Sequence, residues 1–456
     1  GGMQTGRYFG TDGFRGRAGE GLTAEHAYAV GRFLGGRFSR ASGKKCRVVI
    51  GKDTRRSSYM LECSLVAGLT ASGADAYIMH VTTTPSVSYI TRTDGFDCGI
   101  MISASHNAFA DNGIKLIGPG GEKLDDGVVA ELEDYLDGSG GAFPRASGRD
   151  IGASFDYVCG RNRYIGHLIS LSACSFKGYK VGLDCANGSA WQIAKPVFDA
   201  LGARTYVIGC TPDGLNINES GSTRPGRLCA LVRERGLDCG FAFDGDADRC
   251  IAADECGNVV DGDGLMYILA CRLKALGELN GSGIVATVMS NSGLEESLAL
   301  RGIAMRRTDV GDRFVYAQMA ASGAALGGEK SGHIIISKYG ASGDGLVTAI
   351  KVLEAAAERG VSLSALLGGF TPMAQTELSV PVRDRALPFK RGLADFAERT
   401  ARSCGCARVN VRPSGTERAI RIMAEGKELR GCERCVAEIA RYIGDIQGCS
   451  GEICAE

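Results

Sequence analysis

Short runs of β-forming residues alternate along this chain with polar, glycine-containing loops, and many of these loops are followed by amphipathic helical stretches. This alternation is typical of α/β domains built on largely parallel sheets. Ligands of such sheets bind beyond the carboxyl ends of the strands, which is where the loops lie. The clearest strand-and-loop runs are RVVIGKDTRRSS (47–58), CGIMISASHN (98–107), YKVGLDCANGSA (179–190), CGFAFDGDADR (239–249) and GIVATVMSNSG (283–293).

The length of the chain, 456 residues, is about three times that of a ~150-residue domain, so several domains are expected. The alternating pattern breaks at GRDIGASFDY, at ADECGN and at GGFTPMAQ. After residue 375 the order becomes strand, helix, strand, strand, helix, which predicts a smaller α+β module. The sequence therefore predicts three α/β domains and a final α+β domain, spanning 1–155, 156–255, 256–370 and 371–456.

The charge and hydropathy patterns exclude two classes of partner. Lys plus Arg and Asp plus Glu both number 52, so the chain has no overall basic field to attract nucleic acid or anionic lipid. No apolar run reaches the ~18 to 20 residues that cross a bilayer. We therefore expect a cytoplasmic protein with no nucleic-acid partner and no membrane partner.

The 18 cysteines are spread along the chain, and many, such as Cys98, Cys239 and Cys271, have apolar neighbours in sequence. Buried, reduced thiols are the favoured interpretation. A zinc site of four thiolates is the alternative for the C-terminal set Cys404, Cys406, Cys432 and Cys435. The helical periodicity of GCERCVAEIARYI places the last two one turn apart without requiring a metal.

Ser105 lies in ISASHNAFADNGIK (102–115), directly after an apolar run that predicts a buried strand. A serine hydrolase would place its nucleophile in a Gly-x-Ser-x-Gly turn, and Ser105 has neither these glycines nor evident His and Asp partners in the usual order. Ordinary acyl transfer is therefore disfavoured.

Three aspartates follow another predicted strand, in DGDADR: Asp244, Asp246 and Asp248. Alternate residues of an extended chain point to one side, so the three carboxylates can converge. Such a set of oxygen ligands suits Mg²⁺. An EF-hand is disfavoured, because it would require a longer loop with a Glu at its twelfth position. A solvated acidic turn is the structural alternative to a metal site.

The stretch GGEKSGH (327–333) groups Glu329, Ser331 and His333 between glycines. A carboxylate beside a hydroxyl can hold neighbouring hydroxyl groups of a sugar, although an ordinary hairpin would also explain the stretch. Only five histidines occur in the chain, and both His106 and His333 lie in candidate loops. Histidine is frequent in catalytic sites, but a structural role for His106, hydrogen-bonding the Ser105 loop, is an equal alternative to proton transfer.

The stretch RPSGTERAIR (412–421) combines guanidinium groups with hydroxyl groups and a glycine turn. Arginine binds phosphate through two parallel hydrogen bonds, and the amides of such a turn add neutral donors. This combination predicts a phosphate-binding loop, with a simple Pro-Ser-Gly turn as the alternative.

These motifs, together with YFGTDGFRG (8–16), occur in the order and spacing of the α-D-phosphohexomutase superfamily, which the whole chain resembles. Within it the sequence is most similar to the branch that acts on glucosamine phosphates, through DCANGSA, PDGLNIN, VMSNSGLE and RTDVGDR. The resemblance implies three similar α/β domains with mixed sheets and a smaller α+β C-terminal domain around a central cleft.

The resemblance also implies an isomerase in which Ser105 carries a phosphoryl group. Glucosamine 6-phosphate and glucosamine 1-phosphate would be interconverted through phosphoserine and a glucosamine 1,6-bisphosphate intermediate, supplying UDP-N-acetylglucosamine synthesis. One Mg²⁺ per chain would be bound by Ser105, Asp244, Asp246 and Asp248, and the enzyme would act as a monomer or homodimer.

Roles for the remaining residues follow from the same resemblance. Lys115, ranked first, and Arg15 are the candidates for moving a proton at the sugar hydroxyl. Neighbouring cations could lower the pKa of Lys115 toward neutrality. The other predicted site residues are Arg249, His106 and His333 for catalysis, Glu329 and Ser331 for the sugar, and Arg412, Ser414, Gly415, Thr416 and Arg421 for the phosphate that is not reacting.

Four positions depart from the superfamily pattern. Pro is usual where Ala108 and Arg418 stand, and Gly is usual where Ala247 stands. Many glucosamine enzymes have Gln where Lys330 stands. Lys330 bears on substrate choice, so a phosphomannomutase or phosphoglucomutase remains the nearest alternative. A metal-dependent sugar phosphatase and a non-catalytic sugar-phosphate sensor are further alternatives. The former is disfavoured because closure of a phosphate-binding lid would exclude water.

Overall fold

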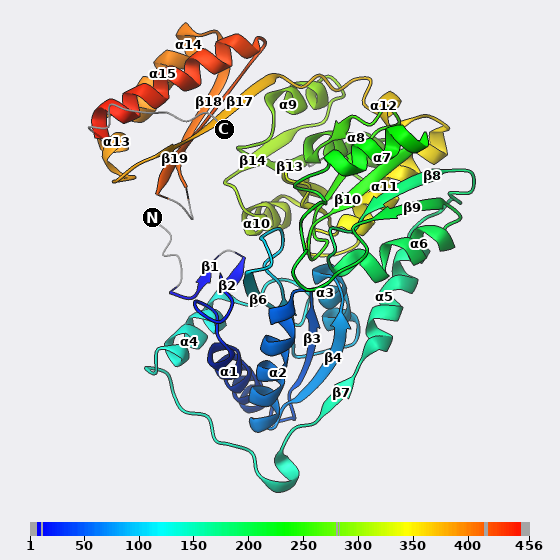
Figure 1. Cartoon of the computed structure of the whole chain (residues 1–456), viewed down its shortest axis with the longest axis vertical. Coiled ribbons are helices and arrows are strands. Elements are labelled where there is room, and N and C mark those ends of the chain that lie inside the picture. The colour runs from blue at the N-terminus through cyan, green and yellow to red at the C-terminus, as the bar shows by residue number, and fades with distance from the viewer. Residues whose placement is uncertain (1–6, 11, 280, 282, 415–417, 448–456) are drawn as a thin grey trace. The chain divides into compact units, whose positions relative to one another are not determined.

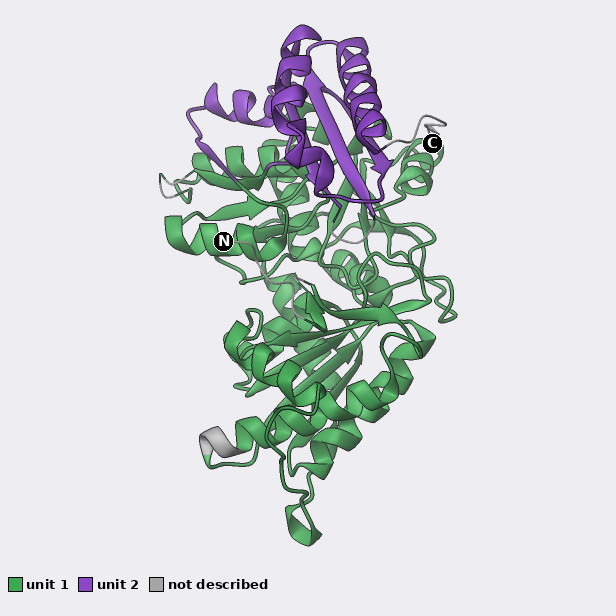
Figure 2. Cartoon of the chain, turned by 90° about the vertical axis from the view of Figure 1, so that its left-hand side faces the viewer, with its two compact units in different colours: residues 1–287, 308–368 green, residues 288–307, 369–456 purple. Residues whose placement is uncertain are grey.

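The computed structural model describes residues 7–447, except residues 11, 280, 282 and 415–417 (Figure 1). The chain forms two compact units, each described here by itself (Figure 2). Unit 1 comprises Gly1–Thr287 and Thr308–Gly368, and unit 2 comprises Val288–Arg307 and Gly369–Glu456. Unit 1 thus contains the three α/β regions, except for a short segment of the third region. This segment, Val288–Arg307, belongs to unit 2 with the C-terminal region. The boundaries of the four predicted domains stay predictions.

The first sheet of unit 1 has seven strands in the order β1-β2-β6-β5-β3-β4-β7. The strands β3, β4, β5 and β7 are parallel, whereas β1, β2 and β6 join through antiparallel pairs. The bounds are β1 Phe9–Gly10, β2 Gly13–Arg17, β3 Arg47–Lys52, β4 Asp75–Val81, β5 Cys98–Ile102, β6 Asp111–Ile117 and β7 Ser154–Asp156. The helices of this region are α1 Ala24–Ser42, α2 Arg56–Ala71, α3 Thr84–Thr93 and α4 Asp126–Leu136, with η1 Gly148–Asp150.

Both faces of this sheet are covered, which explains why β5 and the middle of β3 are apolar. Val48 and Ile50 of β3 pack into a core shared with α1, α2 and α4, whereas Val49 between them packs into a second core with α3. Helices α1 and α2 approach closely at Gly31 and Gly68. A Cβ at Gly68 would lie only 2.2 Å from the Tyr28 carbonyl oxygen, so the contact excludes a side chain there.

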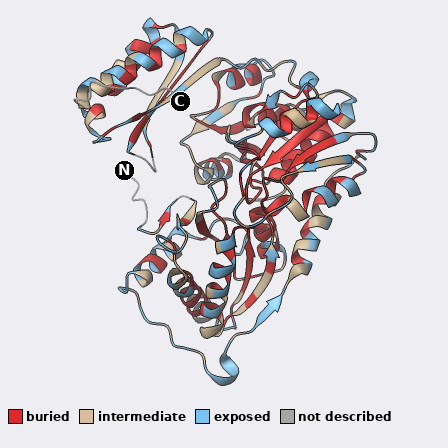
Figure 3. Cartoon of the chain, in the orientation of Figure 1, coloured by how far each residue is buried: buried red, intermediate tan, exposed pale blue. Residues whose placement is uncertain are grey.

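The second sheet has the order β12-β11-β10-β8-β9, and its strands β8, β9 and β10 are parallel. Strands β8 and β10 are buried along most of their length (Figure 3). The strands are β8 Lys180–Asp184, β9 Arg204–Ile208, β10 Cys239–Phe243, β11 Cys250–Ala253 and β12 Val259–Val260. The helices are α5 Val158–Ser170, η2 Ser189–Gln192, α6 Ala194–Ala200 and α7 Gly226–Arg235.

A third sheet in unit 1 pairs β13 with β15 in parallel and β15 with β16 in antiparallel orientation. The bounds are β13 Ile284–Thr287, β15 Leu326–Gly328 and β16 Ile334–Ile336, with α8 Gly262–Ala275, α10 Asp312–Ser322, α11 Gly345–Arg359 and α12 Leu363–Leu366. The chain returns from unit 2 to unit 1 within β14 Met305–Thr308. Mixed sheets in all three regions confirm the predicted α/β class.

Unit 2 contains an antiparallel sheet of order β17-β19-β18 covered by amphipathic helices, which confirms the predicted α+β module. Its elements are α9 Ser292–Ala299, β17 Ala374–Pro381, α13 Leu387–Lys390, α14 Leu393–Ser403, β18 Cys406–Pro413, β19 Ala419–Gly426 and α15 Leu429–Gln447. Cys432 and Cys435 point into its core with Leu393 and Ile439.

Two predictions made from the sequence concern a zinc site and membrane-spanning segments. The four cysteines considered for zinc do not form a metal-binding group, because among the described residues only Asp244, Asp246 and Asp248 have that geometry. Within the described ranges, no helix combines the length and apolar content needed to cross a membrane. The cytoplasmic location stays a prediction.

Candidate active site

Two loops at the carboxyl ends of strands meet in unit 1. Ser105 follows β5, and the aspartates of DGDADR follow β10. The Ser105 hydroxyl donates a hydrogen bond to Asp244 Oδ2 at 2.6 Å, although the two residues are 139 positions apart. The structure therefore brings together the two motifs that the sequence placed on separate loops.

The backbone of Ser105 has a positive φ of 51°, a left-handed conformation that costs roughly 1–2 kcal/mol for a residue with a side chain. Three hydrogen bonds hold it there. The Ser105 amide donates to Ser103 Oγ at 3.0 Å, and its carbonyl oxygen accepts from Arg55 at 3.2 Å and from Asn218 Nδ2 at 2.8 Å. The hydroxyl is thus fixed at one position by the turn of the backbone.

Arg55 is the anchor of this loop. Its fully buried guanidinium group donates to the carbonyl oxygens of Ser105, Asn107 and Asp111, and it forms an ion pair with Asp53 at 3.2 Å. The Asp53 carboxylate in turn accepts from the Ser103 hydroxyl at 2.7 Å. Removing either charge of this pair would leave the other buried and uncompensated.

The three aspartates form a cluster that suits a divalent cation. Their ligand oxygens lie within 4.8 Å of one another, and all three side chains are buried. Burial, followed by the neighbouring charges of Asp248 and Asp246, raises the pKa of Asp244 well above its usual range. One buried oxygen of Asp246 and one of Asp248 have no protein hydrogen-bond partner among the described residues. Hard, unpartnered oxygens under mutual repulsion are what Mg²⁺ would neutralise.

Lys115, on β6, lies directly against this cluster. Its ammonium group is 2.5 Å from Asp246 Oδ2 and 3.4 Å from Asp248 Oδ2. Burial alone would lower the pKa of Lys115, but the Asp246 and Asp248 carboxylates raise it above its usual range. The nearest charges in the structure are these two negative carboxylates, and the lowering of the Lys115 pKa expected beside bound Mg²⁺ stays a prediction.

The cluster is surrounded by two cationic side chains, Arg15 and Arg249, and by the imidazole of His106. Burial, together with the charges of Arg249 and Arg15, lowers the pKa of His106 to about 4, so this imidazole is neutral at pH 7. His106 Nδ1 is buried and has no protein partner among the described residues, so the hydrogen bond proposed for a structural role is not made by that atom. The Arg249 amide donates to Asp244 Oδ1 at 3.2 Å.

The GGEKSGH stretch forms the predicted hairpin, between β15 and β16, and this hairpin contacts the aspartate loop. His333 forms an isolated antiparallel bridge with Arg249, and the Cys250 amide donates to the Gly332 carbonyl at 3.0 Å. Gly332 has a φ of 94°, and a Cβ there would lie 2.2 Å from the Cys250 carbonyl oxygen. The contact between the two loops therefore requires glycine.

The side chains of this hairpin differ in burial. Burial raises the pKa of Glu329, whose carboxylate accepts from the Gly311 amide at 3.3 Å. His333 is buried, and neither ring nitrogen has a hydrogen-bond partner among the described residues. Ser331 is exposed. The hairpin thus presents a carboxylate, an imidazole and a hydroxyl group beside the aspartate loop.

Unit 2 contains the predicted phosphate-binding residues. Arg412 of β18 and Arg421 of β19 are direct partners across the sheet and line a cavity of about 240 Å³ with Glu377, Ser379 and Asn410. Burial and the neighbouring Arg421 charge lower the pKa of Arg412. The backbone oxygen of the buried Ser414 accepts from Arg385 at 2.6 Å. Gly415 and Thr416 lie outside the described residues.

Sequence reasoning missed three residues of the unit 1 site: Arg55, Asn218 and Thr84. The Thr84 hydroxyl donates to Asp246 Oδ2 at 2.5 Å, and its amide donates to the Asp246 carbonyl at 3.0 Å. A threonine at the start of a helix, in TTTPS, looks like an ordinary cap. Only its position on a neighbouring helix, 162 residues away in sequence, shows that it orients a carboxylate of the aspartate cluster.

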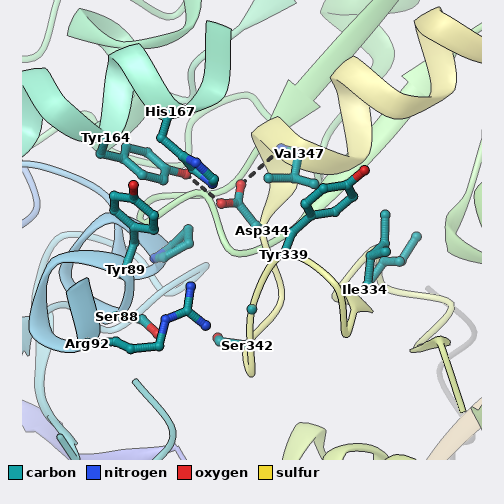
Figure 4. Close-up of a pocket in the computed structure, with 13 residues that line it drawn as sticks. Ser88, Tyr89, Arg92, Tyr164, His167, Ile334, Tyr339, Ser342, Asp344 and Val347 are labelled. Atoms are coloured by element: carbon teal, nitrogen blue, oxygen red, sulfur yellow. Dashed lines mark hydrogen bonds between the residues drawn. The ribbon is translucent and has the colours of Figure 1, made fainter. Parts of the chain in front are cut away.

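A second hollow of unit 1 is lined by α3, α5 and the segment that leads into α11 (Figure 4). Its volume of about 20 Å³ accommodates about one water molecule, so the hollow is too small for a ligand. Asp344 points into it, caps α11 through the amides of Leu346 and Val347, and accepts from the Tyr164 hydroxyl at 2.6 Å. Burial raises the pKa of Asp344 to about 6.

Comparisons with known proteins agree with this arrangement. Models of the phosphoglucomutase/phosphomannomutase family match in order: alpha/beta/alpha domain I over residues 6–140, domain II over 162–257, domain III over 261–373 and the C-terminal domain over 377–442. Phosphoglucosamine mutase from Lachnospira eligens is 52% identical over 96% of this chain and 98% of its own length. The enzyme of the same name from Lachnoclostridium phytofermentans is 53% identical over 97% and 100%.

Solved structures show the same fold at lower identity. A phosphoglucomutase/phosphomannomutase family protein from Burkholderia thailandensis aligns with a TM-score of 0.79 and 24% identity, covering 96% of this chain and 97% of that one. N-acetylphosphoglucosamine mutase from Aspergillus fumigatus, solved with GlcNAc-6P and magnesium, aligns with a TM-score of 0.68 and 17% identity, covering 96% of each chain.

Proposed function

The chain belongs to the phosphoglucomutase/phosphomannomutase family, and we propose that it acts as a phosphoglucosamine mutase, an isomerase that interconverts glucosamine 6-phosphate and glucosamine 1-phosphate. One observation carries the proposal: the hydroxyl group of Ser105 is held 2.6 Å from a buried aspartate of a three-carboxylate cluster. The relatives that share 52% and 53% of its residues bear this name over their full lengths.

In the proposed reaction, Ser105 carries the transferred phosphoryl group. A phosphorylated Ser105 Oγ passes this group to the free hydroxyl of a glucosamine monophosphate, and that hydroxyl loses its proton. The resulting 1,6-bisphosphate turns around and returns its other phosphoryl group to Ser105. The bond from Ser105 Oγ to phosphorus is broken in the first half and formed again in the second, so the enzyme ends as it began.

Asp244, Asp246 and Asp248 would bind Mg²⁺ together with an oxygen of the phosphorylated Ser105. Bound there, Mg²⁺ would neutralise charge on the transferring group. Arg249 stands beside the same carboxylates and adds a fixed positive charge. Thr84 and Lys115 orient the carboxylate of Asp246 before any ligand arrives.

Lys115 remains the first candidate for moving the proton of the sugar hydroxyl, with Arg15 second. Asp246 currently holds the Lys115 ammonium group, and that attraction weakens when the carboxylate is shared with another cation. His106, neutral at pH 7, and His333 add imidazole groups at the edge of the site.

Substrate binding would use two groups of residues. Glu329 and Ser331 would bind sugar hydroxyl groups through complementary acceptors and donors. The phosphate that is not reacting would be bound by Arg412, Ser414, Gly415, Thr416 and Arg421. Two adjacent guanidinium groups repel each other, so a phosphate dianion between them would relieve that repulsion.

A coupled assay that compares the 6-phosphates of glucosamine, glucose and mannose tests this proposal. We expect glucosamine 6-phosphate to give the highest kcat/KM, and an intact-mass spectrum to show a fraction heavier by one phosphoryl group that is absent from Ser105→Ala. A clear preference for glucose or mannose 6-phosphate would instead identify a phosphoglucomutase or phosphomannomutase. Release of inorganic phosphate without isomerisation would identify a phosphatase.

A further inference from the structure

Two thiols of unit 1 lie side by side at the carboxyl ends of neighbouring parallel strands. Cys185 directly follows β8, and Cys210 lies two residues beyond the end of β9, where Asp184 and Ile208 are partners. Both cysteines contact the same backbone oxygen: the Cys185 amide donates to the Ile208 carbonyl at 3.1 Å, and the Cys210 thiol donates to it at 3.5 Å. The two residues therefore share one corner of the sheet.

The two thiols also interact directly and differ in their surroundings. The neighbouring Cys185 thiol lowers the pKa of Cys210, whereas the Cys210 thiol, together with burial, raises the pKa of Cys185. Cys210 is partly exposed, whereas Cys185 is buried. A partly exposed thiol with a lowered pKa beside a buried thiol is the arrangement in which one sulfur attacks a disulfide and the other resolves the product.

We propose that Cys185 and Cys210 are a reversible dithiol–disulfide site, oxidised by low-molecular-weight disulfides that reach Cys210 from solvent. The thiolate of Cys210 attacks one sulfur of the small disulfide, and a mixed disulfide forms while the other half leaves as a thiolate that takes up a proton. Cys185 then loses its proton and attacks the Cys210 sulfur, which releases the second small thiol. The protein loses two hydrogen atoms, and the small disulfide is reduced to two thiols.

The loop that begins at Cys185 supports the candidate active site. The Ala186 carbonyl accepts from the Asn218 amide at 2.8 Å, and the Asn218 side chain holds the Ser105 carbonyl. Three residues further, the Ser189 amide donates to the Gly245 carbonyl in the aspartate loop at 2.8 Å. A bond that draws Cys185 toward Cys210 would therefore shift the supports of both Ser105 and the aspartates.

The strain of this loop strengthens the coupling. Ala186 and Asn187 both have positive φ, 54° and 50°, which few residues other than glycine adopt readily. Such a backbone persists only while its hydrogen bonds hold it, so a new covalent bond beside it would disturb the conformation of the loop. Cys185 is thus next to the strained turn, whereas Cys210 follows a different strand, β9.

Peptide mapping under non-reducing conditions tests the disulfide directly. The full chain is incubated with oxidised glutathione, its free thiols are then alkylated, and it is digested with trypsin. Cleavage yields peptides 181–204 and 205–227, each with a single cysteine, so a linked pair identifies Cys185–Cys210 without ambiguity. We expect the linked pair, and expect dithiothreitol to separate it. Stable glutathione on Cys210 without a linked peptide would overturn the proposal, as would recovery of both peptides alkylated.

Variants separate this pair from the other cysteines. Cys210→Ser removes the attacking thiol from a partly exposed position, and Cys174→Ser, which is also partly exposed, is the matched control. We expect the linked peptides to be lost only in Cys210→Ser. Linkage of peptide 181–204 to another cysteine in that variant would show that Cys185 has no dedicated partner.

The effect on catalysis rests on the proposed function, whereas the mapping does not. We expect oxidation to lower the mutase rate by roughly 10- to 100-fold, the loss that a small displacement of catalytic groups causes, and dithiothreitol to restore it. Cys210→Ser should keep its rate after the same treatment, while Cys174→Ser should lose it. A linked pair with unchanged activity would refute the coupling to the site, and absence of mutase activity in the reduced protein would refute the proposed function instead.

Discussion

The two candidate binding regions are built in different ways. The Ser105 region of unit 1 is a buried network in which each charged side chain is held by others, such as Arg55 by Asp53 and Asp246 by Lys115 and Thr84. The arginine pair of unit 2 lies in an open cavity and consists of two like charges on neighbouring strands. A site that moves a phosphoryl group requires fixed geometry, whereas a site that grips any phosphate requires charge and access.

The largest effect is expected at the fixed site. Ser105→Ala should reduce turnover by several orders of magnitude, because the change deletes the proposed phosphoryl carrier. Its melting temperature should stay near that of the wild type, since the Ser105 backbone contacts remain. Activity and thermal unfolding are measured on the same preparation. A near-normal mutase rate in the purified variant would contradict the proposed mechanism and the contrast drawn between the two regions.

Asp246→Asn should have the next largest effect, a loss of roughly 100-fold in the chemical step at limiting Mg²⁺. A neutral amide cannot offset the charge of the cation, and it also loses the ion pair with Lys115. Titrating the rate with Mg²⁺ gives the apparent affinity. If that affinity is unchanged, the metal binds elsewhere.

Arg421→Ala tests the open region. Loss of one charge-assisted hydrogen-bonding partner should weaken binding by roughly 1.5–3 kcal/mol, for the 1-phosphate and the 6-phosphate alike. Phosphorylation of Ser105 should stay detectable, since that residue belongs to unit 1. Calorimetric titration with each monophosphate separates the two cases. Loss for only one of them would mean that the pair recognises a single orientation.

Thr84→Val should lower activity by roughly tenfold, through the orientation of Asp246 rather than through contact with substrate. The apparent Mg²⁺ affinity should fall together with kcat, while KM for the sugar phosphate stays constant. Thr93→Val, on the exposed end of the same helix, is the control. Equal effects of the two substitutions would show a general weakening of α3.

The smallest effect concerns stability and its dependence on pH. The folded pKa of Asp344, about 6, lies above the unfolded value near 3.9, so the protonated form is favoured by folding. Its stabilising contribution is complete below the unfolded pKa and is lost as pH rises through about 6. Between pH 4.5 and 7, the melting temperature of the wild type should therefore fall by a few degrees relative to Asp344→Asn. A parallel pH dependence in both proteins would contradict this.

The chemical groups of the site were predictable from sequence, but their supports were not. Ser105 and Asp244 each follow a predicted strand, and Glu329 lies in a glycine-bounded stretch, where local pattern and family resemblance agree. Asn218 and Thr84 act through contacts that span 113 and 162 residues, and no local periodicity encodes such a contact. The direction of the Lys115 pKa shift has the same origin, because it depends on which charges lie nearest in space.

The fold shows the same limit. Alternating strands and helices predicted three α/β regions and the C-terminal α+β module correctly. The assignment of Val288–Arg307 to unit 2 was not predictable, because it rests on contacts such as the hydrogen bond of the Ser292 hydroxyl to the buried Glu425, 133 residues away.

The bridge between Arg249 and His333 means that the aspartate loop and the Glu329 hairpin share hydrogen bonds rather than merely neighbouring space. A ligand that stabilises one position of the aspartate loop also selects a position of the hairpin. By thermodynamic reciprocity, whatever factor a bound cation adds to the affinity for a sugar, the sugar must add to the affinity for the cation. The glycine at position 332 permits this close contact, so it is the residue through which the two proposed recognition events would be coupled.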